Sequence, residues 1–244
     1  MMVFFGDSIG IEFEAFSFIH LMLFVLVLVG ATLIYVYRGK LRNYKHERKI
    51  AKTVAVLALL WELALYAWFV GNGTWSWAAN LPIGLCGITL YIGIAALYFK
   101  NYKIFAIGYF WTWGAIASVL FPDIPYSYDR WRFYQFMFGH LNFFFMFLYM
   151  IFVYKWYPTW KDWKRSCIAL SSIVVVLIIT SNVINENLMF MLNGDGSPFE
   201  MFEQFGYIGY LIGVVTMSFG IIFIWFIPFI IYHRRNNHEI NNTL

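Results

Sequence analysis

Seven long apolar runs are the feature that most limits what this chain can fold into. They cover residues 15–37, 53–70, 81–99, 104–120, 133–154, 167–190 and 207–232. A helix needs about 20 mainly apolar residues to cross the hydrocarbon core of a bilayer, whereas strands are usually much shorter. Charged residues make up 12% of the chain, well below the about 25% of a soluble domain. The pattern therefore predicts an all-α fold: one polytopic membrane domain, residues 1–244, with seven transmembrane helices.

Basic residues are distributed unequally between the segments that join these runs. All Lys and Arg residues except Arg130 and Arg132 fall in the first, third and fifth connections or in the C-terminal tail. Because Lys and Arg collect in cytoplasmic loops, we expect an N-terminus outside and a cytoplasmic C-terminus, in a multi-pass protein of the cell membrane. This topology signal explains the net charge of +4, which therefore does not indicate a nucleic acid partner. The basic first loop, residues 38–52, also has the charge to bind anionic lipid headgroups, although a topology signal explains it more simply.

Polar side chains inside the runs gather at one depth. At 1.5 Å per residue they all lie within about 15 Å of the outer surface. They are His20, Glu62, Cys86, His140, Asn182, Asn185, Glu186 and Asn187. Polar groups within a membrane span are costly and mark functional sites. We therefore expect one polar pocket in the outer half of the bundle.

Helical spacing refines this pocket. One face of the sixth run carries Asn182, Asn185, Glu186 and Met189, at positions i, i+3, i+4 and i+7. In the fifth run, Gln135 lies on a different stripe from His140, so the two need not both line the pocket. For Asn185 and Asn187, hydrogen bonding between helices is the competing interpretation.

The stretch "NLPIGLCGITLYIG", residues 80–93, contains Cys86, whose thiol is the candidate nucleophile of this chain. Asn80 suits a helix cap and Pro82 the first turn, so Cys86 is expected just past that turn, where the helix dipole favours a thiolate. Gly84 and Gly87 leave room for a carbonyl group to approach. The competing interpretation of Cys86 is a small buried apolar residue.

A thiol nucleophile needs a base, and His140 lies at a similar depth. Glu62, Glu186 or Asp123 would then orient the imidazole, as the third member of a triad does. A hydrogen-bonded structural histidine is the alternative for His140. Zinc held by His20, His140, Asp123 and Glu186 is a further alternative, although no run carries two His residues at helical spacing. There is no glycine-rich phosphate loop, and we expect no cofactor.

Four motifs in order resemble the YwaF-like bacterial integral membrane proteins over about residues 40 to 230. They are "LPIGLC" (81–86), "FPDI" (121–124), "RFYQFMFGH" (132–140) and "NVINENLMF" (182–190). That family looks distantly related to the animal transmembrane acyltransferase that makes polyunsaturated ether phosphatidylethanolamine, and more remotely to androgen-induced transmembrane hydrolases. The resemblance implies that Cys86 and His140 carry the chemistry. Members commonly have a His two residues before the Cys, where this chain has Gly84.

These features predict a membrane acyltransferase or lipid acyl hydrolase that acts on outer-leaflet phospholipids through an acylated Cys86. Its partners would be a phospholipid or lysolipid substrate. Asn182 and Asn185, or amide groups near Cys86, are candidates to stabilise the oxyanion. A receptor or transporter that binds a small polar ligand or a lipid headgroup in the same pocket is the main alternative.

Overall fold

The computed structural model describes residues 2–77, 80, 82–122, 124–194 and 197–242, and within these ranges it is helical with one isolated bridge, Glu12 to Tyr126. The first half contains α1 (Met2–Phe5), α2 (Phe18–Arg42), α3 (Glu47–Gly71), α4 (Leu85–Phe99), α5 (Tyr102–Gly108), η1 (Tyr109–Trp111) and α6 (Trp113–Leu120). The second half contains α7 (Trp131–Phe152), α8 (Trp160–Ile184), η2 (Leu188–Phe190), η3 (Pro198–Phe205) and α9 (Gly206–Asn242).

Six helical segments are long and apolar enough to cross a membrane. They are α2, α3, the composite α5–η1–α6, α7, α8 and the segment formed by η3 with most of α9. Helix α4 has only 15 residues, about 22 Å of helix against a hydrocarbon core of about 30 Å. The all-helical fold with six candidate spans is therefore confirmed. The seventh span and the direction of the chain across the membrane stay predictions.

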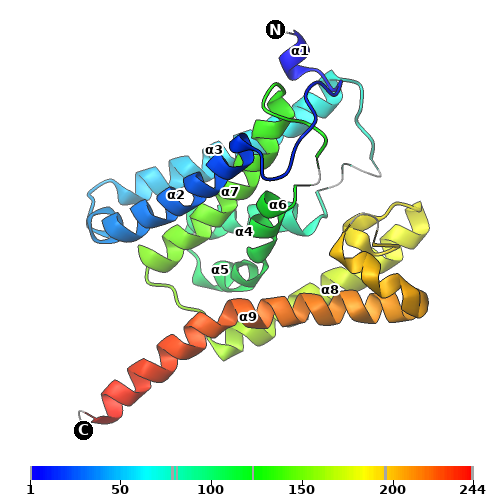
Figure 1. Ribbon diagram of the computed structural model, residues 1–244. Helices are drawn as coiled ribbons and strands as arrows, with labels where there is room; N and C mark the ends of the chain where they lie inside the picture. The colour runs from blue at the N-terminus through cyan, green and yellow to red at the C-terminus, as the bar shows by residue number, and fades with distance from the viewer. Residues whose placement is uncertain (1, 78–79, 81, 123, 195–196, 243–244) are drawn as a thin grey trace.

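Figure 1 shows α4, α5 and α6 between two groups of helices. Helices α2, α3 and α7 lie on one side, where α7 packs against both α2 and α3. Helices α8 and α9 lie on the other side, where α8 packs against α5 and α9 against α6. The central helices therefore contact both groups, and a site on α4 or α6 is enclosed by neighbouring helices.

Apolar side chains occupy both the interior and the surface of the molecule. Phe105, Phe110, Phe147 and Phe226 are fully buried between the central and outer helices. Residues such as Val183, 77% exposed, cover the outer surface of the long helices. An extended exposed apolar surface is typical of a membrane-facing protein, because lipid tails take the place that water would have.

Small residues bring α3 close to its neighbours. Ala51, Ala55 and Ala58 are buried on one stripe, and Glu47 and Glu62 continue the same stripe toward the two ends of the helix. Small side chains let membrane helices approach closely. Both glutamates of α3 therefore face the interior, one at each end of the bundle.

The N-terminal segment crosses the end of the bundle where α3 finishes and α7 begins (Figure 1). Trp68 Nε1 donates to the carbonyl of Phe5 (2.7 Å), and Arg130 Nε donates to the carbonyl of Ser8 (2.8 Å). A hydrogen bond from Phe13 N to Pro125 O (3.2 Å) fixes the later part of the segment. The segment is thus held through its backbone, by two carbonyl acceptors and one N–H donor.

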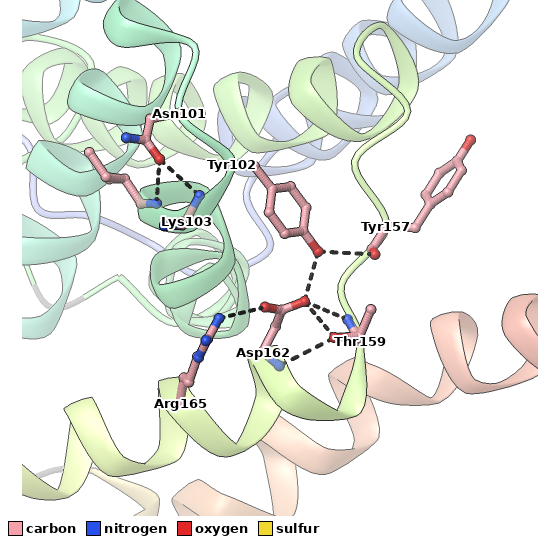
Figure 2. A network of polar contacts seen from close by, with 8 residues as sticks. Asn101, Tyr102, Lys103, Tyr157, Thr159, Asp162 and Arg165 are labelled. Atoms are coloured by element: carbon pink, nitrogen blue, oxygen red, sulfur yellow. Dashed lines mark hydrogen bonds and ion pairs between the residues drawn. The ribbon is translucent and has the colours of Figure 1, made fainter.

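A polar network ties α5 to α8 at the opposite end (Figure 2). The carboxylate of Asp162 accepts hydrogen bonds from the Tyr102 hydroxyl (2.7 Å) and from both the backbone N–H (2.9 Å) and the hydroxyl (2.7 Å) of Thr159. Thr159 and Asp162 form a capping box, which satisfies otherwise free amides at the start of α8. Arg165 lies at 3.8 Å from the same carboxylate.

Candidate functional site

Helix α4 begins later than its sequence indicated. Gly84 is the N-cap, with φ −63° and ψ 148°, so the first helical residue is Leu85. Asn80 does not cap α4, because its side-chain oxygen accepts the amide of Ser76 at 2.8 Å. The expectation that Pro82 occupies the first turn is therefore wrong. Cys86 is the second residue of α4 and lies within the first turn, where backbone N–H groups lack partners in the helix.

The Cys86 thiol faces α6. Its sulfur lies 3.8 Å from the hydroxyl oxygen of Ser118, and a Cβ at Gly114 would lie 3.6 Å from that sulfur. Cys86 also begins the stripe on which Leu90 and Leu97 are buried. The thiol thus occupies the inward face of α4 at its first turn.

Helices α4 and α7 touch where Gly93 meets Phe147. A Cβ at Gly93 would lie 2.9 Å from the Phe147 ring, so only glycine allows this approach. Cys86 precedes Gly93 by seven residues, and His140 precedes Phe147 by seven residues, which is about two helical turns in each case. Arg48 donates to carbonyls at the end of α4 and to the hydroxyl of Tyr154 just after α7, so the two helices end at the same side of the bundle. This register gives Cys86 and His140 a similar level along the two helices, whereas the Cys86 sulfur itself faces α6.

The His140 imidazole has a defined tautomer. Its Nδ1 lies 2.8 Å from the carbonyl oxygen of Phe136, and a carbonyl accepts only, so Nδ1 carries the proton. Nε2 is then an acceptor, and it makes no hydrogen bond within the described part of the chain. The ring packs against Phe136 and Phe143, with centroids at 4.3 and 5.7 Å. Among the described residues no hydrogen bond joins His140 to Cys86.

A second polar group lies between α3 and α4. Buried Glu62 accepts a hydrogen bond from the Tyr66 hydroxyl at 3.3 Å, and that hydroxyl lies 3.0 Å from the hydroxyl of Tyr91. Tyr91 is five residues after Cys86, which turns it about 140° around α4. The thiol and the Glu62 carboxylate therefore lie on different faces of α4.

Arg132 connects the first turn of α7 to this group. Its guanidinium donates to the side-chain oxygen of buried Gln135 (2.5 Å) and interacts electrostatically with Glu62 and with His140. The backbone carbonyl of Gln135 accepts the indole N–H of Trp61 (3.2 Å). Arg132 is thus hydrogen-bonded to Gln135 and acts on Glu62 and His140 only through its charge, and Gln135 and His140 lie on different stripes of α7, as the spacing indicated.

The Asn-rich end of α8 does not join these groups. Helix α8 ends at Ile184, and Asn185 adopts the left-handed conformation (φ 54°, ψ 41°) that stops it. The expected helical face of Asn182, Asn185 and Glu186 is therefore broken after its first member. Asn182 donates to the Tyr207 hydroxyl at 3.1 Å, toward α9.

Asn187 holds the turn that follows α8 rather than bonding between helices. Its side chain accepts the amides of Leu192 (3.0 Å) and Asn193 (3.4 Å), and donates to the side-chain oxygen (2.6 Å) and the backbone carbonyl (3.0 Å) of Asn193. Asp123, the other candidate to orient the imidazole, lies outside the described residues.

His20 is buried and has both ring nitrogens engaged. Its Nδ1 accepts the amide of Phe16 (2.8 Å), so Nε2 must donate to the carbonyl of Val119 (2.7 Å). This arrangement joins the start of α2 to the end of α6. Within the described ranges, no three His, Cys, Asp or Glu side chains lie together as metal ligands would.

Four residues of the site were missed from the sequence: Tyr66, Tyr91, Ser118 and Arg132. A spacing signal existed for two of them, because Tyr66 is four residues after Glu62, and Arg132 precedes His140 by eight. No local signal pairs Ser118 with Cys86, because the two meet only when α4 packs against α6.

Comparisons with known proteins identify the family of this chain but no similar curated protein or solved structure. A search of the curated proteins and a search of the solved structures each found no similar protein. The sequence profile of the TMEM164 family, a transmembrane family, matches residues 15–231, which includes α2 to α8 and most of α9. The chain therefore belongs to the TMEM164 family.

Proposed function

We propose that this protein transfers or hydrolyses acyl chains of phospholipids in the outer leaflet of the cell membrane, with Cys86 as nucleophile and His140 as base. The observation that carries the proposal is the register of α4 and α7. The contact of Gly93 with Phe147, two turns from Cys86 and from His140 along their helices, supports a similar level for the thiol and the imidazole.

The protonation state of His140 supports its assigned role. Because Nδ1–H donates to Phe136, Nε2 holds the free lone pair that a general base requires. Nε2 takes the proton of the Cys86 thiol, and the sulfur then bonds to the ester carbonyl carbon. The carbon–oxygen ester bond breaks, and the same proton passes to the departing alkoxide to give a lysolipid and an acyl thioester.

The second half of the reaction decides between transferase and hydrolase. The hydroxyl of a lysolipid, or a water molecule, attacks the thioester and gives its proton to Nε2. The carbon–sulfur bond breaks and the proton returns to the sulfur. The N–H groups of Leu85, Cys86 and Gly87, which have no acceptor within α4 itself, would stabilise the negative charge that develops on the carbonyl oxygen.

Glu62 and Arg132 have positioning roles in this proposal. The positive charge of Arg132 attracts the carboxylate of Glu62 and disfavours a protonated His140, although no ion pair at contact distance joins these groups among the described residues. The same buried charges favour a second candidate, a receptor or transporter that binds a polar ligand or a lipid headgroup without breaking a bond.

Acyl exchange in liposomes tests the proposal. Purified protein is mixed with phosphatidylcholine that carries isotope-labelled acyl chains and with unlabelled lysolipid, and label transfer or fatty acid release is followed by mass spectrometry. Cys86→Ala abolishes both reactions, and His140→Ala lowers them about 100-fold or more. Cys167→Ala on α8 is the matched control and retains full activity. Unchanged rates in Cys86→Ala and His140→Ala would reject the mechanism, and saturable lipid binding without turnover would favour the receptor or transporter.

A further inference from the structure

A hollow of about 530 Å³ lies at the start of α3, at the basic end of the bundle. Three cationic side chains from the first two turns of α3 line it: Arg48, Lys49 and Lys52. Its wall continues with Thr53, Val56 and Leu57 of α3 and with Tyr98 at the end of α4. The hollow is thus basic at its outer rim and apolar toward the middle of α3.

The arginine of this hollow is held in place by α4. Its guanidinium donates to the carbonyls of Leu97 (3.2 Å) and Tyr98 (2.7 Å), and to the hydroxyl of Tyr154 (2.7 Å). These carbonyls belong to the last turn of α4, where no amide of that helix can reach them. Lys52 lies over the ring of Tyr98 at 5.2 Å. Two of the three cations are therefore positioned against α4 before any ligand binds.

No carboxylate among the described residues forms an ion pair with the two lysines of the hollow. The nearest carboxylate in sequence, Glu47, is buried and accepts hydrogen bonds from the hydroxyls of Tyr149 (3.0 Å) and Tyr154 (2.6 Å). Over the described ranges, the two ion pairs formed lie elsewhere, at Arg130–Asp129 and Arg165–Asp162. Lys49 and Lys52 thus have no carboxylate partner there.

The shape of the hollow distinguishes a lipid from a soluble anion. Lys49 and Lys52 lie within the first two turns of a helix that is long and apolar enough to span a membrane. Val56 and Leu57 follow one turn deeper, with exposed fractions of 42% and 58%. A free phosphate would use only the rim, whereas a phospholipid would use the rim for its phosphate and the apolar wall for an acyl chain.

We propose that this hollow binds the phosphate headgroup of an anionic phospholipid, with one acyl chain along Val56 and Leu57. The lipid belongs to the leaflet at the basic end of the bundle, which the distribution of Lys and Arg predicts to be cytoplasmic. Basic hollows at this level of a membrane protein are suited to anionic headgroups. The inference does not depend on the proposed acyl chemistry, because the hollow and Cys86 lie at opposite ends of α4.

Lipid binding to the full-length protein tests this site. The protein in detergent is titrated with phosphatidylglycerol and, separately, with phosphatidylcholine, and bound lipid is counted by native mass spectrometry. The tested variant is Lys49→Gln with Lys52→Gln. The matched control is Lys161→Gln with Lys164→Gln, which removes the same charge from exposed positions on α8. A third variant, Lys49→Arg with Lys52→Arg, retains the charge.

Each basic residue near anionic lipid contributes about fivefold to binding, so loss of both lysines weakens phosphatidylglycerol binding roughly 30-fold. The α8 control and the arginine variant bind within about threefold of the unmodified protein. Equal weakening in the tested and control variants would overturn the site, because it would show attraction by net charge alone. Equal binding of the two lipids, or complete displacement of phosphatidylglycerol by 10 mM inorganic phosphate, would overturn it as well. Thermal denaturation of each variant identifies any that fails to fold, and Lys49→Gln alone, with about fivefold weaker binding, then serves as the test.

Discussion

Replacing Asp162 by alanine is expected to loosen the junction between α5 and α8 more than any other single polar change at that end. Asp162 is 4% exposed, and its carboxylate accepts three hydrogen bonds, one from Tyr102 and two from Thr159 (Figure 2). Loss of the helix cap costs about 1 kcal/mol, and loss of a hydrogen bond to a charged group costs about 1.5–3 kcal/mol. Asp162→Ala should therefore lower the free energy of unfolding by about 2.5–4 kcal/mol.

Reversible unfolding in mixed micelles with increasing dodecyl sulfate, followed by circular dichroism, measures this loss. A double-mutant cycle separates its parts. Tyr102→Phe removes only the hydroxyl and should cost about 1.5–2 kcal/mol, whereas the exposed neighbour Lys161→Ala should change stability by less than about 0.5 kcal/mol. In the double variant, Tyr102→Phe should add less than it costs alone, because only the longer hydrogen bond from its hydroxyl to the Tyr157 carbonyl (3.3 Å) then remains to be lost. Fully additive losses, or a loss below about 1 kcal/mol in Asp162→Ala, would refute the network as drawn.

Three further predictions concern other parts of the molecule. Gly93→Leu should separate α4 from α7, because even a Cβ meets the Phe147 ring at 2.9 Å, and should lower acyl exchange at least tenfold. Gly39→Leu, where a Cβ meets nothing within 4 Å, is its control, and equal activity of the two would contradict the register. Burial, reinforced by the hydrogen bond to Glu47, raises the pKa of the Tyr154 phenol above its usual value near 10, so its contribution to stability is complete below pH 10 and falls at higher pH. Alkaline unfolding curves of Tyr154→Phe should lack part of this loss, and identical curves would contradict it. Gly10→Val should displace the N-terminal segment, because the side chains of Asp129 and Arg130 occupy the space of a Cβ, and limited proteolysis within residues 2–17 should accelerate. Unchanged proteolysis would show that the segment is not held there.

The long apolar runs were sufficient to predict the helical fold, because any segment in lipid must satisfy its backbone internally. Six runs form helices of spanning length. The observed helices extend beyond the runs at the starts of α3 and α8 and at the end of α9, and two ends fall well inside the runs. Gly84 delays the start of α4, and Asn185 ends α8 six residues before the apolar run ends. Sequence periodicity does not predict these two helix ends, because tertiary contacts decide whether a glycine or an asparagine continues the helix.

A single sequence can assign each candidate residue a depth along its helix, but it cannot assign the pairings between helices. Depth follows from counting residues along each helix, so Cys86, Glu62 and His140 were expected near one end of the bundle. Which side chains meet depends on the rotation of each helix about its axis. That rotation directs Cys86 to Ser118 on α6 and Tyr91 to Tyr66 on α3, and it leaves Asn182 facing Tyr207. Contacts between distant segments of this kind have no signal in a single sequence.

Detection of an acyl thioester on Cys86 would test the proposed chemistry most directly. Protein is mixed for a few seconds with labelled phosphatidylcholine in liposomes, quenched with acid and digested, and the peptide that contains Cys86 is analysed by mass spectrometry. The account predicts an added acyl mass on Cys86 that neutral hydroxylamine removes, and its absence in His140→Ala. Label transfer without any adduct on Cys86, or an adduct that forms equally in His140→Ala, would contradict the pairing of thiol and imidazole.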